Sequence, residues 1–151
     1  MKKNDELESF LRSKAATAPE AEPEVDWEAR KNKWLDETEK LYGLVWKWLE
    51  PLAREGTIRC SREPMTVEED NIGSYRVDVL TLSIGKQRVE FRPKGTQFEG
   101  VDGLVDVSGQ RAVRTLVLKR GQWFVVEKAM LLKTFPFNKD SFRDLLQDVM
   151  V

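Results

Sequence analysis

The chain has no histidine among its 151 residues and a single cysteine, Cys60. Histidine is the commonest general base and metal ligand, so its absence excludes the Ser-His-Asp triad and any metal site that needs imidazole ligands. One cysteine cannot form an intramolecular disulfide, and without histidine it cannot complete a thiolate zinc site. Arg59 and Arg62 could lower the pKa of the Cys60 thiol, but an unreactive thiol is the favoured interpretation because no general base accompanies it. The sequence therefore favours a non-enzyme without catalytic residues, metal ligands or cofactors.

Long apolar runs are also missing. The chain has no stretch of about 20 apolar residues and no signal-peptide pattern, so no membrane span is predicted and the expected location is cytoplasmic. Charged residues make up 34% and hydrophobic residues 40%, which is typical of a globular domain. Residues 1–75 carry 12 Lys/Arg and 17 Asp/Glu, whereas residues 76–151 carry 13 and 9. The basic half either meets an anionic partner or is neutralised by the acidic helix packed over it.

Residues 1–25 are interpreted as an N-terminal arm and linker, and residues 26–151 as a single domain. Leu7, Phe10 and Leu11 have the i, i+3, i+4 spacing of an amphipathic helix within residues 4–16, which is too short to be stable alone. Alanine, proline and glutamate dominate residues 15–24, as in semi-rigid linkers. The arm is therefore either a loose tail or a segment that docks on the domain or on a partner.

Tryptophan is concentrated in one predicted helix, which contains four of the five in the chain. Asp26 is a suitable N-cap, and Gly56 offers a left-handed stop at the other end. Between them an apolar stripe with a 3.6-residue period predicts a long helix covering a sheet, with Pro51 expected to kink or restart it. The stripe comprises Trp34, Leu35, Leu41, Tyr42, Val45, Trp48, Leu49 and Leu52.

The rest of the chain predicts strands and then a second helix. Candidate strands cover residues 57–61, 75–84, 87–92, 103–108, 111–119 and 123–128, with a charged loop at 62–71. Short glycine-containing turns between them favour an antiparallel meander of five or six strands. Asn138 is a suitable N-cap for a C-terminal helix, and Phe137 and Phe142 have the spacing of a hydrophobic staple. The predicted fold is α+β, with a long N-terminal helix and a C-terminal helix packed on one face of the sheet.

Trp27 and Trp46 are the tryptophans most easily left outside the core. Trp27 is in heptad register with Trp34 and Trp48 but close to the start of the helix, and Trp46 lies beside the stripe. One interpretation is that all four tryptophans only cover the sheet. The alternative is that Trp27 or Trp46 anchors a protein partner or a second copy of the chain, with the arm residues Leu7, Phe10 and Leu11 as a further contact.

A set of cations on the predicted strands is the second candidate site. Arg88 and Arg92 should share one face of a strand, Lys94 follows them, and Arg114 could join them depending on the register. A basic sheet face with nearby aromatic rings can bind single-stranded nucleic acid. The alternative is a solvated charged face, because acidic residues interrupt the series.

Carboxylates on the predicted strands are the third candidate. Asp78, Glu90, Asp102 and Asp106 could hold a divalent ion in a metal-dependent nuclease or hydrolase if they came together. The acid followed by Glu-x-Lys of such enzymes is not matched, since Phe91 and an arginine follow Glu90. Cross-strand ion pairs with the arginines explain these acids better.

The leading hypothesis is a non-catalytic binding or accessory module that acts through protein contacts, with a protein partner or a homodimer. Nucleic-acid binding through Arg88, Arg92 and Arg114 is the alternative, and a metal-dependent hydrolase the third. The arrangement loosely resembles that of small bacterial proteins, and this resemblance assigns no role to any residue.

Overall fold

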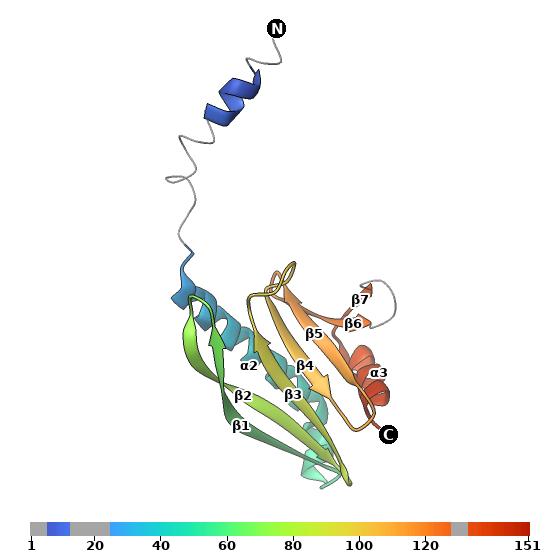
Figure 1. Ribbon diagram of the computed structural model, residues 1–151. Coiled ribbons are helices and arrows are strands. Elements are labelled where there is room, and N and C mark those ends of the chain that lie inside the picture. The colour runs from blue at the N-terminus through green and yellow to red at the C-terminus, as the bar shows by residue number, and fades with distance from the viewer. Residues whose placement is uncertain (1–5, 13–24, 128–132) are drawn as a thin grey trace.

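The computed structural model describes residues 6–12, 25–127 and 133–151 (Figure 1). The predicted linker and Lys128, expected at the end of a strand, lie outside these ranges. Residues 6–12 form a short helix, and no described helix has the length and hydropathy needed to span a membrane. The other elements are α2 (Trp27–Arg54), β1 (Ile58–Glu69), β2 (Gly73–Ile84), β3 (Gln87–Gly95), β4 (Gly103–Ser108), β5 (Val113–Lys119), β6 (Gln122–Glu127), β7 (Lys133–Pro136) and α3 (Lys139–Val149).

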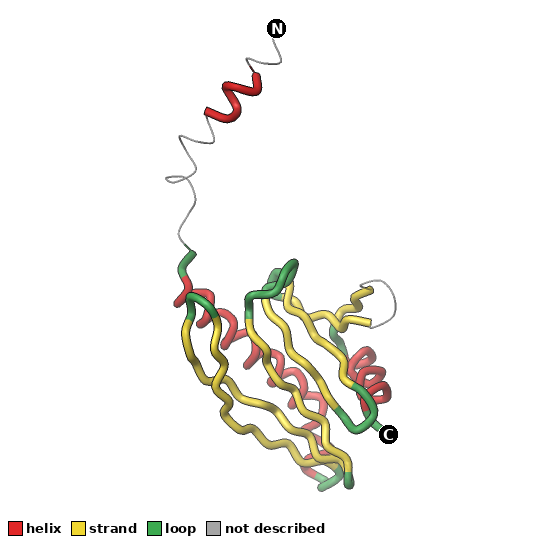
Figure 2. The backbone as a smooth tube through the Cα atoms, viewed as in Figure 1, coloured by secondary structure: helices red, strands yellow, loops and turns green. Residues whose placement is uncertain are grey.

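The strands form one antiparallel sheet in which each strand pairs with the next along the chain. Both α2 and α3 pack on the same face of this curved sheet, as Figures 1 and 2 show. The α+β prediction is confirmed, with seven strands in the described residues where five or six were expected.

Local sequence signals determine where α2 begins and ends. The Asp26 side chain accepts a hydrogen bond of 3.0 Å from the backbone of Ala29, which caps the first turn. The restart predicted at Pro51 is wrong, because the helix continues through this residue to Arg54. Pro51 lacks the N–H that would bond the carbonyl four residues earlier, so one intrahelical hydrogen bond is missing there. Gly56, with φ of +86°, then turns the chain into β1.

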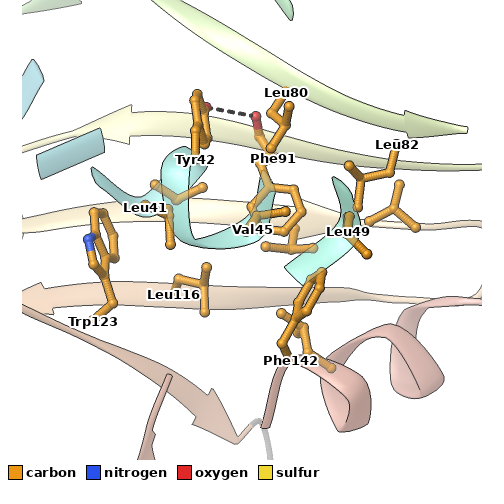
Figure 3. Packing of buried hydrophobic residues seen from close by; sticks show 14 of the residues in the cluster. Leu41, Tyr42, Val45, Leu49, Leu80, Leu82, Phe91, Leu116, Trp123 and Phe142 are labelled. Carbon is orange, nitrogen blue, oxygen red and sulfur yellow. Dashed lines mark hydrogen bonds between the residues drawn. The ribbon is translucent and has the colours of Figure 1, made fainter. Parts of the chain in front are cut away.

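The core lies between α2 and the middle strands (Figure 3). Leu41 and Val45 of α2 are fully buried, as are Phe91 of β3 and Leu116 of β5. The ring of Trp34 fills the space over Gly103 so closely that a Cβ atom there would lie 2.1 Å from Trp34 Cζ3. Glycine at this position is therefore part of how the tryptophan is buried.

The sheet splits between β2 and β3. These strands pair only from Leu80 to Ile84, and beyond Leu80 the β1–β2 hairpin separates from β3. The alternation of buried residues in β2 shifts by one residue at this point. The odd-numbered Tyr75, Val77 and Val79 are buried before it, and the even-numbered Leu80 and Leu82 are buried after it. The hairpin therefore turns its other side inward where it leaves β3.

Polar contacts hold the separated part of the hairpin. We call Glu69, Tyr75, Thr96 and Gln97 the Glu69 network. The Glu69 carboxylate accepts hydrogen bonds from Tyr75 Oη at 2.5 Å, from Thr96 N at 2.7 Å and Oγ1 at 3.1 Å, and from Gln97 N at 3.2 Å. Arg30 of α2 donates to Thr96 as well. The network joins the tip of the hairpin to the loop after β3 and to the start of α2.

The predicted loop at residues 62–71 is wrong, because β1 continues through it to Glu69. Strand β1 is an edge of the sheet, so proline and charged residues are tolerated there and conceal the period-two pattern. The edge strand β7 was also missed, since all four of its residues are exposed. Both edges contain a proline, Pro64 in β1 and Pro136 in β7.

The second helix follows its predicted signals. Asn138 and Ser141 form a reciprocal capping box at the start of α3. The rings of Phe137 and Phe142 meet at 5.8 Å, which confirms the expected staple. At the other end, Val151 exchanges two backbone hydrogen bonds with the Gln87 side chain. The helix is therefore held at both ends.

Candidate functional site

An apolar groove of about 500 Å³ lies between the C-terminal half of α2 and α3. The two helices pack on the same side of the sheet, and their facing flanks form its walls. Its apolar lining consists of Trp48, Leu49, Leu52, Phe142, Leu146 and Met150. Leu52 is 39% exposed, so the groove presents apolar surface to solvent.

Helical periodicity places these side chains. Trp48 and Leu52 are one turn apart on the flank of α2 that faces α3, and Leu146 and Met150 are one turn apart on the facing side. The Trp48 ring lies 5.5 Å from the ring of Phe142. This ring contact holds the Trp48 side chain in place. The wall that it forms is therefore present before any ligand binds.

Cations line the rim of the groove. Arg111, Lys139 and Arg143 all border it. Arg143 forms exposed ion pairs with Asp140 and Asp144, whereas Arg111 and Lys139 form none among the described residues. The backbone of Arg111 is held by a hydrogen bond of 2.8 Å from its N–H to the carbonyl of Val149.

The charges of α3 are separated between its two flanks. Lys139 and Arg143 lie towards α2, and Asp140, Asp144 and Asp148 line a second groove towards β6 and β7. The α3 side of the apolar groove therefore carries positive charge, and the three aspartates lie on the other flank of the helix.

Trp27 and Trp46 both lie away from this groove. The guanidinium carbon of Arg30 lies 5.4 Å from the centre of the Trp27 ring, which is half-buried. Trp46 is 48% exposed and lies on the opposite flank of α2, where it lines a second hollow together with Cys60. Trp48, predicted as a core residue, is the tryptophan that borders the groove.

The predicted arm residues lie on the short helix over residues 6–12. Leu7, Phe10 and Leu11 are 56%, 56% and 54% exposed, so all three present apolar surface to solvent. On the same helix the Arg12 guanidinium and the Glu8 carboxylate form an exposed ion pair at 3.3 Å.

The predicted basic face is divided between the two sides of the sheet. Arg88, Arg92 and Lys94 alternate with buried residues of β3 and so lie on the side away from the helices. Arg114 pairs with the buried Val107, which places it on the helix side, 3.7 Å from Asp148 of α3. Arg114 therefore does not join the other cations.

Acidic neighbours accompany two of the three cations on the outer face. Arg92 donates hydrogen bonds to Met65 Sδ at 3.1 Å and to Glu90 at 3.3 Å. Lys94 lies 4.0 Å from Asp106. The surface is thus a mixture of charges and not a continuous basic track.

The four predicted acidic residues are held separately. Asp78 pairs with Arg62, and Glu90 pairs with Arg92. Asp102 accepts the backbone N–H of Arg120, and Asp106 accepts the hydroxyl of Thr115. Within residues 6–12, 25–127 and 133–151, no three acidic or cysteine side chains gather as metal ligands would.

Cys60 is half-buried, and burial raises the pKa of its thiol. The lowering effect considered for Arg59 and Arg62 is therefore wrong. Arg62 instead pairs with Glu39 and Asp78. A thiol with a raised pKa is less often the reactive thiolate.

Sequence reasoning missed the second wall and the rim of the groove. A signal was present, because Lys139, Arg143, Leu146 and Met150 follow i, i+4, i+7, i+11 spacing and so share one helix flank. The pairing of that flank with Trp48 depends on tertiary packing, which periodicity does not reveal.

Comparison of the chain with protein-family models, with curated proteins and with solved structures gives no significant match. The function is therefore inferred from the groove itself, through its shape, its apolar lining and the charges at its rim.

Proposed function

We propose that this chain is a non-catalytic binding module of the cytoplasm that takes an amphipathic, acidic helical segment of a protein into the groove between α2 and α3. The observation that carries the proposal is the combination of an apolar lining with the cations Arg111, Lys139 and Arg143 at its rim. Apolar side chains at i, i+3 and i+4 of a helix fit such a groove, as in other helix-in-groove complexes.

The energetics support a protein ligand. Burying apolar area contributes about 25 cal/mol per Å², and only the part that exceeds the cost of lost translational and rotational freedom appears as affinity. A helical segment that places several leucine-sized side chains in the groove buries more apolar area than a small ligand does. The rim cations favour acidic partners mainly through orientation and association rate. Arg111 and Lys139, which have no ion pair among the described residues, can each take a carboxylate without losing an existing partner.

The geometry gives less support to nucleic-acid binding. That hypothesis needed Arg88, Arg92 and Arg114 on one surface, and Arg114 lies on the other side of the sheet. Arg92 also has an acidic neighbour already. Protein binding is therefore the function that we propose.

The test uses a designed 15-residue peptide with leucines at i, i+3, i+4 and i+7 and glutamate at most other positions. Its affinity for the chain is measured by fluorescence anisotropy, together with that of a version carrying lysine in place of glutamate. We expect the glutamate peptide to bind at least tenfold more tightly, and the preference to weaken as salt is added. Equal affinities for the two peptides would contradict the proposal.

Two variants locate the binding site. Leu146→Asp places a charge in the wall of the groove and should reduce the affinity at least tenfold. Trp46→Ala removes an exposed ring on the opposite flank of α2 and serves as the matched control. Loss of binding in Trp46→Ala but not in Leu146→Asp would move the site to the Trp46 flank and overturn the assignment of the groove.

A further inference from the structure

The chain itself contains a segment with the chemistry that the groove accepts. We infer that residues 6–12 dock as a helix in the α2–α3 groove of the same chain, an inference that rests on the proposed function of that groove. The segment would then compete with any external partner for the same surface.

The apolar face of the segment is the first argument. Leu7, Phe10 and Leu11 have i, i+3, i+4 spacing, and each is more than half exposed in the short helix. Seven helical residues are too few to be stable alone in water, so packing against a surface is what such a helix needs. The groove offers the matching apolar lining of Trp48, Leu52 and neighbouring side chains.

Charge is the second argument. Glu6 and Glu8 lie in the first turn of the helix, and Asp5 precedes them in the sequence; basic residues occur at positions 2, 3, 12 and 14. The ion pair of Glu8 with Arg12 is fully on the surface and so costs little to exchange. The acidic turn suits the rim cations Arg111 and Lys139.

The reach of the tether is the third argument. Leu49 lies about 33 Å along α2 from its first residue, at 1.5 Å per residue. Residues 13–26 connect the segment to α2, and fourteen residues span up to about 46 Å when extended and about 43 Å as polyproline II. The connection is therefore long enough to run back along α2 and deliver the segment to the groove.

The exposed side of α2 is compatible with this path. Lys33, Lys40 and Lys47 are seven residues apart, so they form one exposed stripe along the helix. The connecting sequence carries Glu20, Glu22 and Glu24 and no cation after Lys14. Opposite charges on the two segments favour an antiparallel approach of the connection to α2.

Tethering makes this contact effective even if the intrinsic affinity is low. A tether of about this length that can span the two sites holds them at an effective concentration on the order of millimolar. An external peptide can then bind only those molecules whose groove is not occupied by the segment. Its apparent affinity is reduced in proportion to the fraction of molecules with an empty groove. The segment acts as a built-in competitor that only a tighter or more abundant partner displaces.

Cross-linking in the full chain tests the docking directly. In a Cys60→Ser background, Ser9→Cys is combined with Gln147→Cys at the groove or with Ser61→Cys on β1, and a bismaleimide is added at low protein concentration. We expect intramolecular links to Gln147→Cys at least tenfold faster than links to Ser61→Cys. The added changes Leu7→Asp and Phe10→Asp should remove that preference, since they keep the tether and abolish the apolar face.

Competition gives a second readout. The glutamate peptide should bind the Leu7→Asp, Phe10→Asp variant at least fivefold more tightly than the unchanged chain. Equal link rates at the two sites, or links formed only between molecules, would overturn the inference. If the peptide then binds both chains equally well, the groove is still a binding site and only the docking fails. If it binds neither chain, the proposed function fails.

Discussion

The hydroxyl of Tyr42 donates a hydrogen bond of 2.6 Å to the carbonyl oxygen of Asp78, where β2 separates from β3. The carbonyl of Phe91 lies 3.3 Å from the same hydroxyl (Figure 3). Pairing between the two strands ends two residues away from Asp78, at Leu80 and Phe91. The Tyr42 hydroxyl thus supplies a donor from α2 where the neighbouring strand no longer does.

Replacing Tyr42 with phenylalanine should destabilise the fold by about 1–3 kcal/mol, because a buried carbonyl loses its donor while the ring remains. The free energy of unfolding is measured by urea denaturation. The ring contact with Phe91, at 6.5 Å and nearly perpendicular, is kept in the variant. A loss of less than about 0.5 kcal/mol would mean that water replaces the donor at no cost.

Alkaline pH should destabilise the protein through its two tyrosines. Burial raises the pKa of Tyr42, and burial followed by the hydrogen bond and charge of Glu69 raises the pKa of Tyr75, both above the ordinary value of 10.0. The folded state therefore keeps these protons while the unfolded state releases them. This stabilisation is complete below pH 10 and is lost as the pH rises from there towards the folded-state pKa.

The difference in unfolding free energy between the unchanged chain and Tyr42→Phe isolates one of these groups. That difference should shrink by about 1.4 kcal/mol between pH 9 and pH 11, because only the unchanged chain has a tyrosine at position 42 to ionise on unfolding. Absorbance of tyrosinate at 295 nm should also rise at higher pH in the folded protein than in urea. A difference that stays constant over this range would contradict the assignment.

The Glu69 network should contribute more to stability than its surface position suggests. Glu69→Ala removes acceptors from Tyr75 and from the buried Thr96, and we expect a loss of about 2–4 kcal/mol. Glu68→Ala is the matched control, since within the described part of the chain Glu68 accepts one hydrogen bond, from the exposed Ser74. Urea unfolding of both variants makes the comparison. Equal losses would show that the network does not hold the hairpin.

Replacement by alanine should change the stability of the fold in opposite directions at two glycines. In Gly103→Ala the added methyl group would overlap the ring of Trp34, so a loss of about 1–3 kcal/mol is expected from overpacking. In Gly43→Ala no atom lies within 4 Å of the new Cβ, and an exposed helical site should gain about 0.5–1 kcal/mol. Thermal unfolding of both variants checks the signs, and a stable Gly103→Ala would require Trp34 to have moved.

The central elements were predictable because their residues repeat with the period of the element. The stripe through Leu41 and Val45 predicted α2, and alternation through Val89 and Phe91 predicted β3. The same reasoning failed for β1, where Pro64 and exposed charged residues leave no alternation to read. Local capping signals such as Asp26 and Asn138 were reliable since they depend only on neighbouring residues.

The candidate site was less predictable than the fold. Periodicity assigned Trp48 to the core, and it does contact Phe142, but its exposed side forms a wall whose other half is α3. Which flanks of the two helices meet depends on how each packs on the sheet they share. That packing depends on strand register, which the residue pattern does not reveal. The same reason explains Arg114, which register places on the helix side and not beside Arg92.

The prolines of the two edge strands have a consequence for assembly. An open sheet can recruit a further strand through the unpaired backbone groups at its margins, which is how β-augmentation and amyloid-like stacking begin. Pro64 in β1 and Pro136 in β7 each lack a backbone N–H, so neither margin offers an unbroken row of donors. Growth by strand addition is therefore disfavoured at both margins of the sheet.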